Sequence, residues 1–179
     1  MTPISPEEAS GELRAVYDRI AGARGGYVGN VFRALGASPA TLDVVAEVGA
    51  HFRRTGRLDP ITKELLVLAI AAELRNEYEW AHHWRAVTGL GVEPDAVLRH
   101  LEGSPDAGIA AVLAVARAVA TRGLVDPADV ASVQAHHGDE GLVEVVVMAG
   151  HYGLLAAVIE VFEVPLEPWA DATPLPPER

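Results

Sequence analysis

The chain has 179 residues, of which 50 % are hydrophobic and 22 % are charged, a balance typical of one globular domain with a sizeable core. Its formal net charge of −11, without any clustered basic stripe, argues against nucleic acid and anionic lipid as partners. It has no cysteine, which excludes disulfides, thiolate nucleophiles, cysteine-ligated zinc and dithiol redox chemistry.

The first third of the chain is predicted to form helices that glycine and proline separate. Ser5 and Glu8 have the spacing of a capping box, which predicts a first helix that runs to about Ala23. The segment 27–38 predicts a short second helix. A serine–proline start signal then predicts a third helix over residues 39–56.

The middle of the chain is predicted to contain the buried central helix. An Asp-Pro signal precedes "ITKELLVLAIAAEL", residues 61–74, which is apolar on most faces. The segment 75–90 continues this helix directly or after a slight break. A Glu-Pro signal then predicts a short helix over residues 94–101.

The last third is predicted to be helical up to a proline-rich tail. One helix is expected over residues 109–123, a second over 127–138 after another Asp-Pro signal, and a long buried one over 139–162, despite its β-branched "VVVM". The tail, residues 163–179, contains five prolines and cannot be helical. It either wraps the surface or packs onto a neighbouring subunit. The prediction is an all-α fold with a single domain over residues 1–179.

The sequence gives no sign of export or membrane insertion. The N-terminal "MTPISPEEASGEL" lacks the basic and apolar regions of a secretory signal. Apolar runs such as "LLVLAIAA" are shorter than a membrane span. We expect a soluble cytoplasmic protein without a membrane partner.

Ionisable and aromatic side chains concentrate in "NEYEWAHHWRAVTGLGV", which starts at Asn76. Helical spacing places Asn76, Glu79 and His83 on one face, and Tyr78 and His82 on a second face about 100° away. Only one of these faces can point fully into a site. A carboxylate against an imidazole raises the histidine pKa and orients one ring nitrogen, as in an acid–base pair. The alternative is a surface ion pair worth a few tenths of a kcal/mol.

Two further positions could contribute to the same site. Glu64 is either a first-turn carboxylate that the helix dipole favours or a buried group that needs a partner. His151 and Tyr152 interrupt a buried helix and could reach the pocket, although a core tyrosine and a boundary histidine are the more ordinary interpretation. Four arginines are near enough in sequence to bind an anionic substrate: Arg53, Arg54, Arg75 and Arg85.

A metal site has only partial support. Glu79 and His82 match half of the carboxylate–histidine motif of di-iron bundle proteins, but no other histidine follows a glutamate at that spacing. A mononuclear site from Glu79, His82 or His83 and a distant histidine is a minor alternative, because zinc and iron need three convergent ligands. We expect no metal and no other cofactor.

The residues Glu64, Asn76, Glu79 and His83 resemble the site of the carboxymuconolactone decarboxylase and alkyl hydroperoxidase D superfamily. In the peroxidase branch a helix glutamate is followed by Cys-x-x-Cys-x-x-x-His, and the two cysteines correspond here to Asn76 and Glu79. The version "YEWAHH" is similar to cysteine-free members. The resemblance also includes "YVGNVFRALGASPATL", "LDPITKELLVLAIAAEL" and "GDEGLVEVVVMAGHYGLLAAVIEVFEVP", so it covers most of the chain.

This resemblance implies an alkyl hydroperoxidase D-like helical fold and a homo-oligomer, as a dimer, trimer or hexamer. Because both thiols are absent, thiol peroxidase activity is excluded. What remains is a cofactor-free decarboxylase- or isomerase-type lyase acting on a small organic acid. His83, oriented by Glu79, would be the general acid or base, and Glu64 would hold or share the proton. The substrate-binding side chains would be Asn76, Tyr78, Trp80, His82, His151 and Tyr152.

Two other functions stay open at this stage. One is a cofactor-free cyclase or dehydratase of a biosynthetic pathway with a larger apolar substrate. The other is a non-catalytic oligomeric binding protein. A small pocket with an arginine would favour the organic acid, and a long apolar pocket would favour the biosynthetic enzyme.

Overall fold

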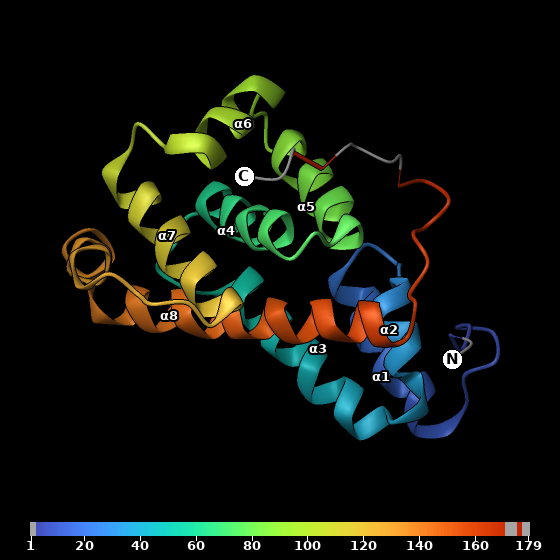
Figure 1. Cartoon of the computed structure of the whole chain (residues 1–179). Coiled ribbons are helices and arrows are strands. Elements are labelled where there is room, and N and C mark those ends of the chain that lie inside the picture. Colours follow the sequence, from blue (N-terminus) through green and yellow to red (C-terminus); the bar gives the residue numbers. More distant parts are fainter. Residues whose placement is uncertain (1–2, 171–174, 177–179) are drawn as a thin grey trace.

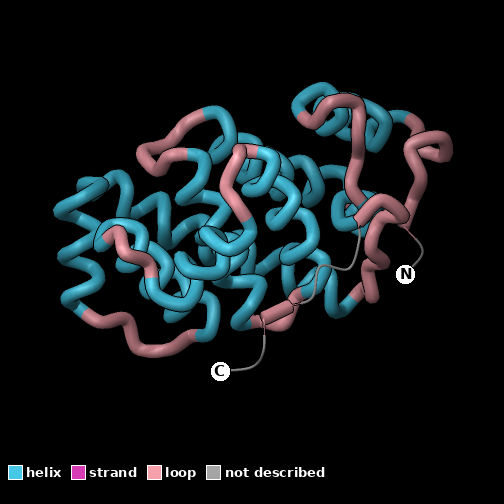
Figure 2. Tube along the Cα trace, turned by 90° about the horizontal axis from the view of Figure 1, so that it is seen from above, coloured by secondary structure: helices cyan, strands magenta, loops and turns pink. Residues whose placement is uncertain are grey.

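The computed structural model describes residues 3–170 and 175–176, and the regular elements in this part of the chain are helices (Figures 1 and 2). The predicted all-α fold is confirmed. The elements in chain order are α1 (Gly11–Ala23), α2 (Asn30–Ala34), the 3-10 turn η1 (Leu35–Ala37), α3 (Pro39–Arg54), α4 (Pro60–Glu73), α5 (Glu77–Gly89), α6 (Pro94–Gly103), α7 (Ala107–Thr121) and α8 (Pro127–Val161).

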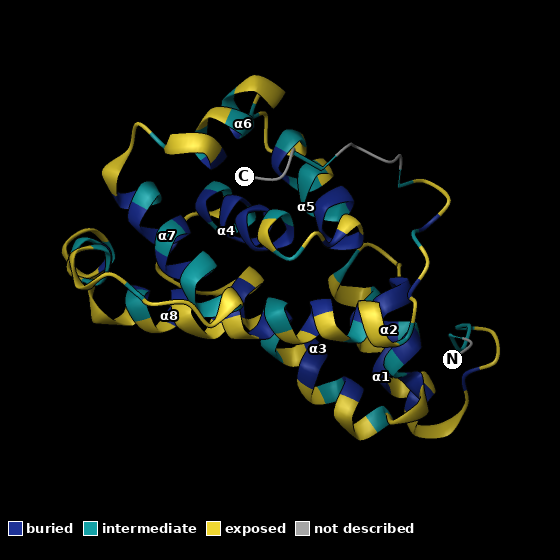
Figure 3. Cartoon of the chain, viewed as in Figure 1, coloured by how far each residue is buried: buried dark blue, intermediate teal, exposed yellow. Residues whose placement is uncertain are grey.

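The centre of the molecule is α4, as its sequence predicts. Every residue from Leu65 to Ala71 is buried, and the helix packs against α5, α7 and α8 (Figure 3). Burying one such aliphatic side chain stabilises the fold by about 1.5–3 kcal/mol, so this helix anchors the others. The site residues on α4 are therefore carried by a rigid element.

Local start signals place the helix N-termini where the sequence predicts them. The carboxylate of Asp59 accepts hydrogen bonds from the N–H groups of Ile61 (3.0 Å) and Thr62 (3.1 Å). Asp126 caps α8 in the same way, by accepting from Ala128 N–H at 2.8 Å. Each capping aspartate precedes a proline at the first helical position, where the missing N–H costs nothing.

The first helix begins later than predicted. Ser5 and Glu8 do form the reciprocal capping box, with Ser5 N–H donating to Glu8 Oε2 at 2.9 Å and Glu8 N–H donating to Ser5 Oγ at 3.3 Å. This box closes only an isolated turn, and α1 begins at Gly11, whose φ is 55°. The positive φ separates the turn from the helix.

A tight break turns α4 back on itself to give α5. Arg75 has a left-handed φ of 53°, and the side chain of Asn76 then caps α5 by accepting Glu79 N–H at 2.9 Å. The two helices pack against each other as a hairpin. This packing brings Glu64 of α4 to His83 of α5.

The long helix α8 packs against α3, α4 and α7 (Figure 1). Gly138 has a non-helical φ of 73°, so α8 consists of the two predicted pieces. By length and composition α8 is apolar enough to cross a membrane, a property that core helices of globular proteins share. The tail, as far as it is described, wraps its own chain, where Glu167 is buried and contacts α2 and α5.

Candidate active site

A cavity of about 300 Å³ lies between α1, α2 and α3 on one side and α4, α5 and α8 on the other. Gly29, Val31 and Leu155 supply part of its apolar lining. Its ionisable lining side chains are Arg24, Tyr27, Arg53, Glu64, Tyr78, Glu79, His82, His83, His151 and Tyr152. This concentration of titratable groups in one cavity is the usual mark of a catalytic or binding site.

His83 lies between two carboxylates in the wall of this cavity. Its Nδ1 is 2.6 Å from Glu64 Oε2, a hydrogen bond, and its Nε2 is 3.2 Å from Glu79 Oε2. The side chains of His83, Glu64 and Glu79 are 17 %, 22 % and 7 % exposed. The structure therefore brings together the three predicted acid–base residues, with Glu64 as the nearer partner.

Two opposing effects determine the charge of His83. Burial is the largest single effect and lowers the pKa, because it disfavours the imidazolium. Glu64, and then Glu79, act against burial through charge and hydrogen bonding, and together they raise the pKa of His83 from 6.5 to about 9. At neutral pH the group is an imidazolium held between two carboxylates.

The neighbouring face of α5 is held by the tail. The rings of Tyr78 and His82 stack at 4.4 Å, and Trp169 meets His82 edge-on at 4.8 Å. Glu167 accepts hydrogen bonds from the Tyr78 hydroxyl (2.6 Å) and Asn30 N–H (2.8 Å), and lies 2.5 Å from His82 Nε2. Both faces of α5 contribute side chains to the cavity, Glu79 and His83 from one face and Tyr78 and His82 from the other, although we expected only one face to point fully into it.

Glu167 is the most strongly coordinated carboxylate at this edge. Burial alone would raise its pKa, but the hydrogen bonds from His82, Tyr78 and Asn30 outweigh burial and lower the pKa to about 2. The same burial, followed by the Glu167 hydrogen bond and charge, raises the pKa of Tyr78. Glu167 is therefore ionised and Tyr78 is neutral at any ordinary pH.

His151 and Tyr152 reach the cavity from α8, as predicted. Tyr152 meets His83 edge-on at 5.1 Å between ring centroids and His151 edge-on at 5.3 Å. Burial, then the charges of Glu79 and Glu64, raise the pKa of Tyr152. Burial also lowers the pKa of His151, and Arg24 and Arg53 add to this effect while Glu79 opposes it. Both side chains are therefore neutral at neutral pH.

Two arginines, Arg24 and Arg53, line the cavity. Arg24 ends α1, and its guanidinium lies 4.5 Å from the centroid of the Phe32 ring. Arg53, from α3, stands at the exposed rim. In the described part of the chain, no carboxylate forms an ion pair with either guanidinium.

Two residues that we expected at this site lie elsewhere. Trp80 is only 1 % exposed and packs in the core, with its ring stacked on Trp84 at 5.4 Å. Asn76 is the N-cap of α5, because a short amide before the first turn satisfies a free N–H. Neither side chain lines the cavity.

Of the four arginines proposed from the sequence, only Arg53 lines the cavity. Arg54 is paired with Glu47 at 2.6 Å on the surface, and Arg75 donates to the carbonyl of Pro176 at 2.5 Å. Arg85 stacks on Trp169 at 4.6 Å. Several lining or supporting residues were not predicted from the sequence, among them Arg24, Gly49, Glu167 and Trp169.

The described residues contain no group of three His, Asp or Glu side chains placed to hold a metal ion. At His83, each ring nitrogen already faces a carboxylate, Nδ1 toward Glu64 and Nε2 toward Glu79. Glu64 and Glu79 therefore lie on opposite sides of the His83 ring, so the three side chains do not converge on one point.

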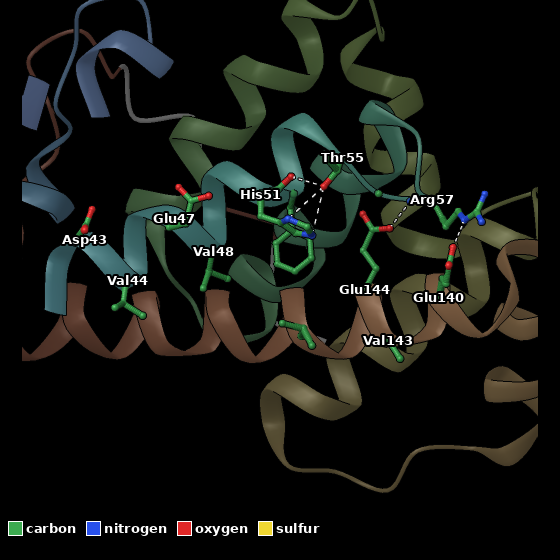
Figure 4. A pocket seen from close by; sticks show the side chains of 13 residues that line it. Asp43, Val44, Glu47, Val48, His51, Thr55, Arg57, Glu140, Val143 and Glu144 are labelled. Atoms are coloured by element: carbon green, nitrogen blue, oxygen red, sulfur yellow. Dashed lines mark hydrogen bonds and ion pairs between the residues drawn. The ribbon is translucent and has the colours of Figure 1, made fainter. Parts of the chain in front are cut away.

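A larger, open hollow of about 960 Å³ lies elsewhere, between α3 and α8 (Figure 4). Exposed valines such as Val44 and Val143 line it. Its buried charge, Glu144, has a structural role, because it accepts Arg57 N–H (2.5 Å) and Leu58 N–H (3.2 Å) and pairs with Lys63 at 3.2 Å. The acid–base group is not in this hollow, so we place the candidate site in the smaller cavity.

Residues 39–121, from the start of α3 to the end of α7, match the carboxymuconolactone decarboxylase family. This matched segment is 83 of the 179 residues, and over it the chain is similar to the carboxymuconolactone decarboxylase family. The matched segment contains Glu64, Glu79 and His83, whereas Arg24 and His151 lie outside it.

Two solved structures share the fold of this chain. They are a cysteine-to-alanine variant of the debrominase Bmp8 in complex with 2,3,4-tribromopyrrole (TM-score 0.80) and apo Bmp8 (TM-score 0.79). Each is 16 % identical and covers 93 % of this chain and 91 % of the Bmp8 chain. This similarity establishes the helical fold. A comparison with curated protein sequences found no match.

Proposed function

We propose that this chain is a cofactor-independent enzyme, a lyase or isomerase, that adds a proton to carbon or removes one in a small organic acid. The observation that carries the proposal is His83 held between Glu64 and Glu79 in the wall of the cavity. A positioned acid–base group of this kind accelerates proton transfer by about 10²–10⁴-fold.

The two nitrogens of His83 have different roles in this proposal. Nδ1–H donates a short hydrogen bond to Glu64 at 2.6 Å, whereas Nε2 lies farther from its partner, 3.2 Å from Glu79. Nε2 is therefore the atom from which a proton moves. Glu64 keeps the proton on Nδ1 and so fixes the tautomer that remains after transfer. This assignment gives Glu64 the orienting role that the sequence suggested for Glu79.

In a decarboxylation, the bond between carbon and the departing carboxylate breaks and its electron pair stays on carbon. That carbon takes the Nε2 proton of His83 while CO₂ leaves. In a double-bond isomerisation, Glu79 first accepts a proton from one carbon and His83 donates one to another. Both reactions need only the residues that are present in the cavity.

The cavity favours a small acid over a large apolar substrate. Its volume of about 300 Å³ is at the lower end of ligand pockets, and two arginines line it. The Bmp8 variant was solved with a small brominated ring, 2,3,4-tribromopyrrole. Bmp8 is a debrominase, and in this variant one of its cysteines is replaced by alanine. This chain has no cysteine, and we do not propose debromination for it.

The test is proton transfer in deuterated water. The wild-type chain is incubated with carboxymuconolactone and a panel of unsaturated carboxylic acids, and deuterium at carbon is followed by NMR. His83→Gln should lower the rate at least about a hundredfold, because the proton donor is gone, without changing the helical circular dichroism. His100→Gln, remote from the cavity, is the matched control. Full activity in both His83→Gln and Glu79→Gln, or no turnover across the panel, would contradict the proposal.

A further inference from the structure

We propose that the cavity contains a carboxylate-binding site above Gly49, formed by Arg24, Arg53 and His151, which anchors the acid that His83 protonates. The identity of the bound molecule as a substrate rests on the proposed function. The anion site itself rests on the geometry around Gly49, which is independent of the chemistry at His83.

Three nitrogen atoms converge on the empty position beside Gly49. A Cβ atom built there would lie 3.3 Å from His151 Nε2, 3.8 Å from Arg24 Nη2 and 3.9 Å from Arg53 Nη1, and these are the three nearest atoms. They come from three separate parts of the fold, namely the end of α1, α3 and α8. The space that a side chain would fill is thus surrounded by nitrogen atoms that can donate hydrogen bonds.

Gly49 is an unfavourable choice for the helix itself. It lies well inside α3, where glycine costs about 1 kcal/mol relative to alanine. Its helical backbone has no need of a glycine, because its φ is not positive. We infer that glycine is used here because a side chain would take up room beside Arg24, Arg53 and His151 that the ligand needs.

The charge of the site calls for an anion. Burial, followed by repulsion from Arg53, lowers the pKa of Arg24 to about 10, so both guanidiniums are cations at neutral pH. The stacking of Arg24 on Phe32 holds its guanidinium in place. Two neighbouring cations without an ion-pair partner among the described residues are stabilised when an anion joins them. Guanidinium groups bind a carboxylate with paired N–H bonds.

His151 completes the site as a neutral donor. Its pKa is lowered, with burial as the main cause, so it adds a hydrogen-bonding nitrogen without adding a third positive charge. Tyr152 separates His151 from His83, since its ring packs edge-on against both. An anchored carboxylate is therefore distinct from the carbon that His83 protonates. The substrate class is an acid that keeps one carboxylate and reacts at a carbon several bonds away.

The binding test uses benzoate and its neutral isostere benzamide, measured by titration calorimetry near neutral pH. Benzoate should bind at least about tenfold more tightly than benzamide, because only benzoate neutralises the two arginines. Arg24→Gln and Arg53→Gln should each weaken benzoate binding about tenfold or more. Arg54→Gln, whose arginine is paired with Glu47 on the surface, is the matched control and should bind as the wild type does.

Gly49→Ala gives the sharpest result. The added methyl group would lie 3.3 Å from His151 Nε2 and beside both arginines, so it should weaken benzoate binding about tenfold or more, while the helical circular dichroism stays the same. Gly22→Ala in α1, where a Cβ meets nothing within 4 Å, should leave binding unchanged. If Gly49→Ala does not fold, Arg53→Gln at the exposed rim still decides the question.

Benzoate and benzamide of equal affinity, no benzoate binding by the wild type, or unchanged binding in Arg53→Gln would overturn the inference. Binding of inorganic phosphate in place of benzoate would overturn it as well, since the site would then select another anion. His83→Gln separates the two proposals, because it should lose turnover yet still bind benzoate. If His83→Gln keeps turnover while Arg53→Gln loses binding, the proposed function fails and the anion site stands.

Discussion

At His83 the balance between burial and charge determines what the residue can do. A buried imidazole with no carboxylate nearby would be neutral at physiological pH. Glu64 and Glu79 reverse this preference and raise the pKa to about 9. His83 is therefore already protonated before a substrate binds. Glu64 and Glu79 belong to the site as much as His83 does.

The raised pKa of His83 makes stability depend on pH. Because the folded pKa (about 9) exceeds the ordinary value (6.5), protonation stabilises the fold fully below pH 6.5, and this contribution is lost as pH rises toward 9. The loss is on the order of 3 kcal/mol. Urea unfolding across this interval measures it. His83→Gln should flatten the dependence, whereas His100→Gln should keep it; equal slopes in the wild type and His83→Gln would show that His83 is not the cause.

At the scale of elements, two short segments assemble the site. The break at Arg75 and Asn76 folds α5 against α4 and so brings His83 to Glu64. The tail brings Glu167 to the other face of α5, where it joins Tyr78.

Replacing Glu167 tests the contribution of the tail. Glu167→Ala leaves Asn30 N–H and the Tyr78 hydroxyl without their acceptor, which should cost about 3 kcal/mol of unfolding free energy. Since the folded pKa of Glu167 is about 2 against an ordinary 4.5, its contribution is present above pH 4.5 and disappears as pH falls toward 2. Urea unfolding near neutral pH, with exposed Glu160→Ala as control, measures the loss. A loss no larger than that of the control would mean that the tail contributes little.

Across the whole molecule, the sequence predicts features that depend on neighbouring residues, such as helix starts, and misses features that depend on tertiary packing. The starts of α4 and α8 follow from Asp-Pro signals that depend on a few neighbouring residues. Glu64 and His83 could be paired through the family resemblance, although they are distant in sequence. These features needed no three-dimensional information.

The site residues that were wrongly predicted or missed share one physical origin, which is that tertiary packing places them. Trp80 and a pocket aromatic look alike in sequence, because both sit among apolar neighbours, and only packing shows that Trp80 faces the core. Arg24 reaches the cavity from a helix end, and Glu167 from a tail whose prolines predict only the absence of helix. Among these missed residues, only Gly49 has a sequence signal, because it is a glycine inside a helical pattern. Assembly into homo-oligomers and a cytoplasmic location stay predictions.

The protonation of His83 between Glu64 and Glu79 underlies the proposed function. Its most direct test is a ¹⁵N NMR titration of the His83 ring, assigned by the signals that vanish in His83→Gln. We predict a midpoint near pH 9 in the wild type, a lower midpoint in Glu64→Gln, and no change in Glu140→Gln, whose carboxylate pairs with Arg57 on the surface. A wild-type midpoint at or below 6.5 would contradict this protonation.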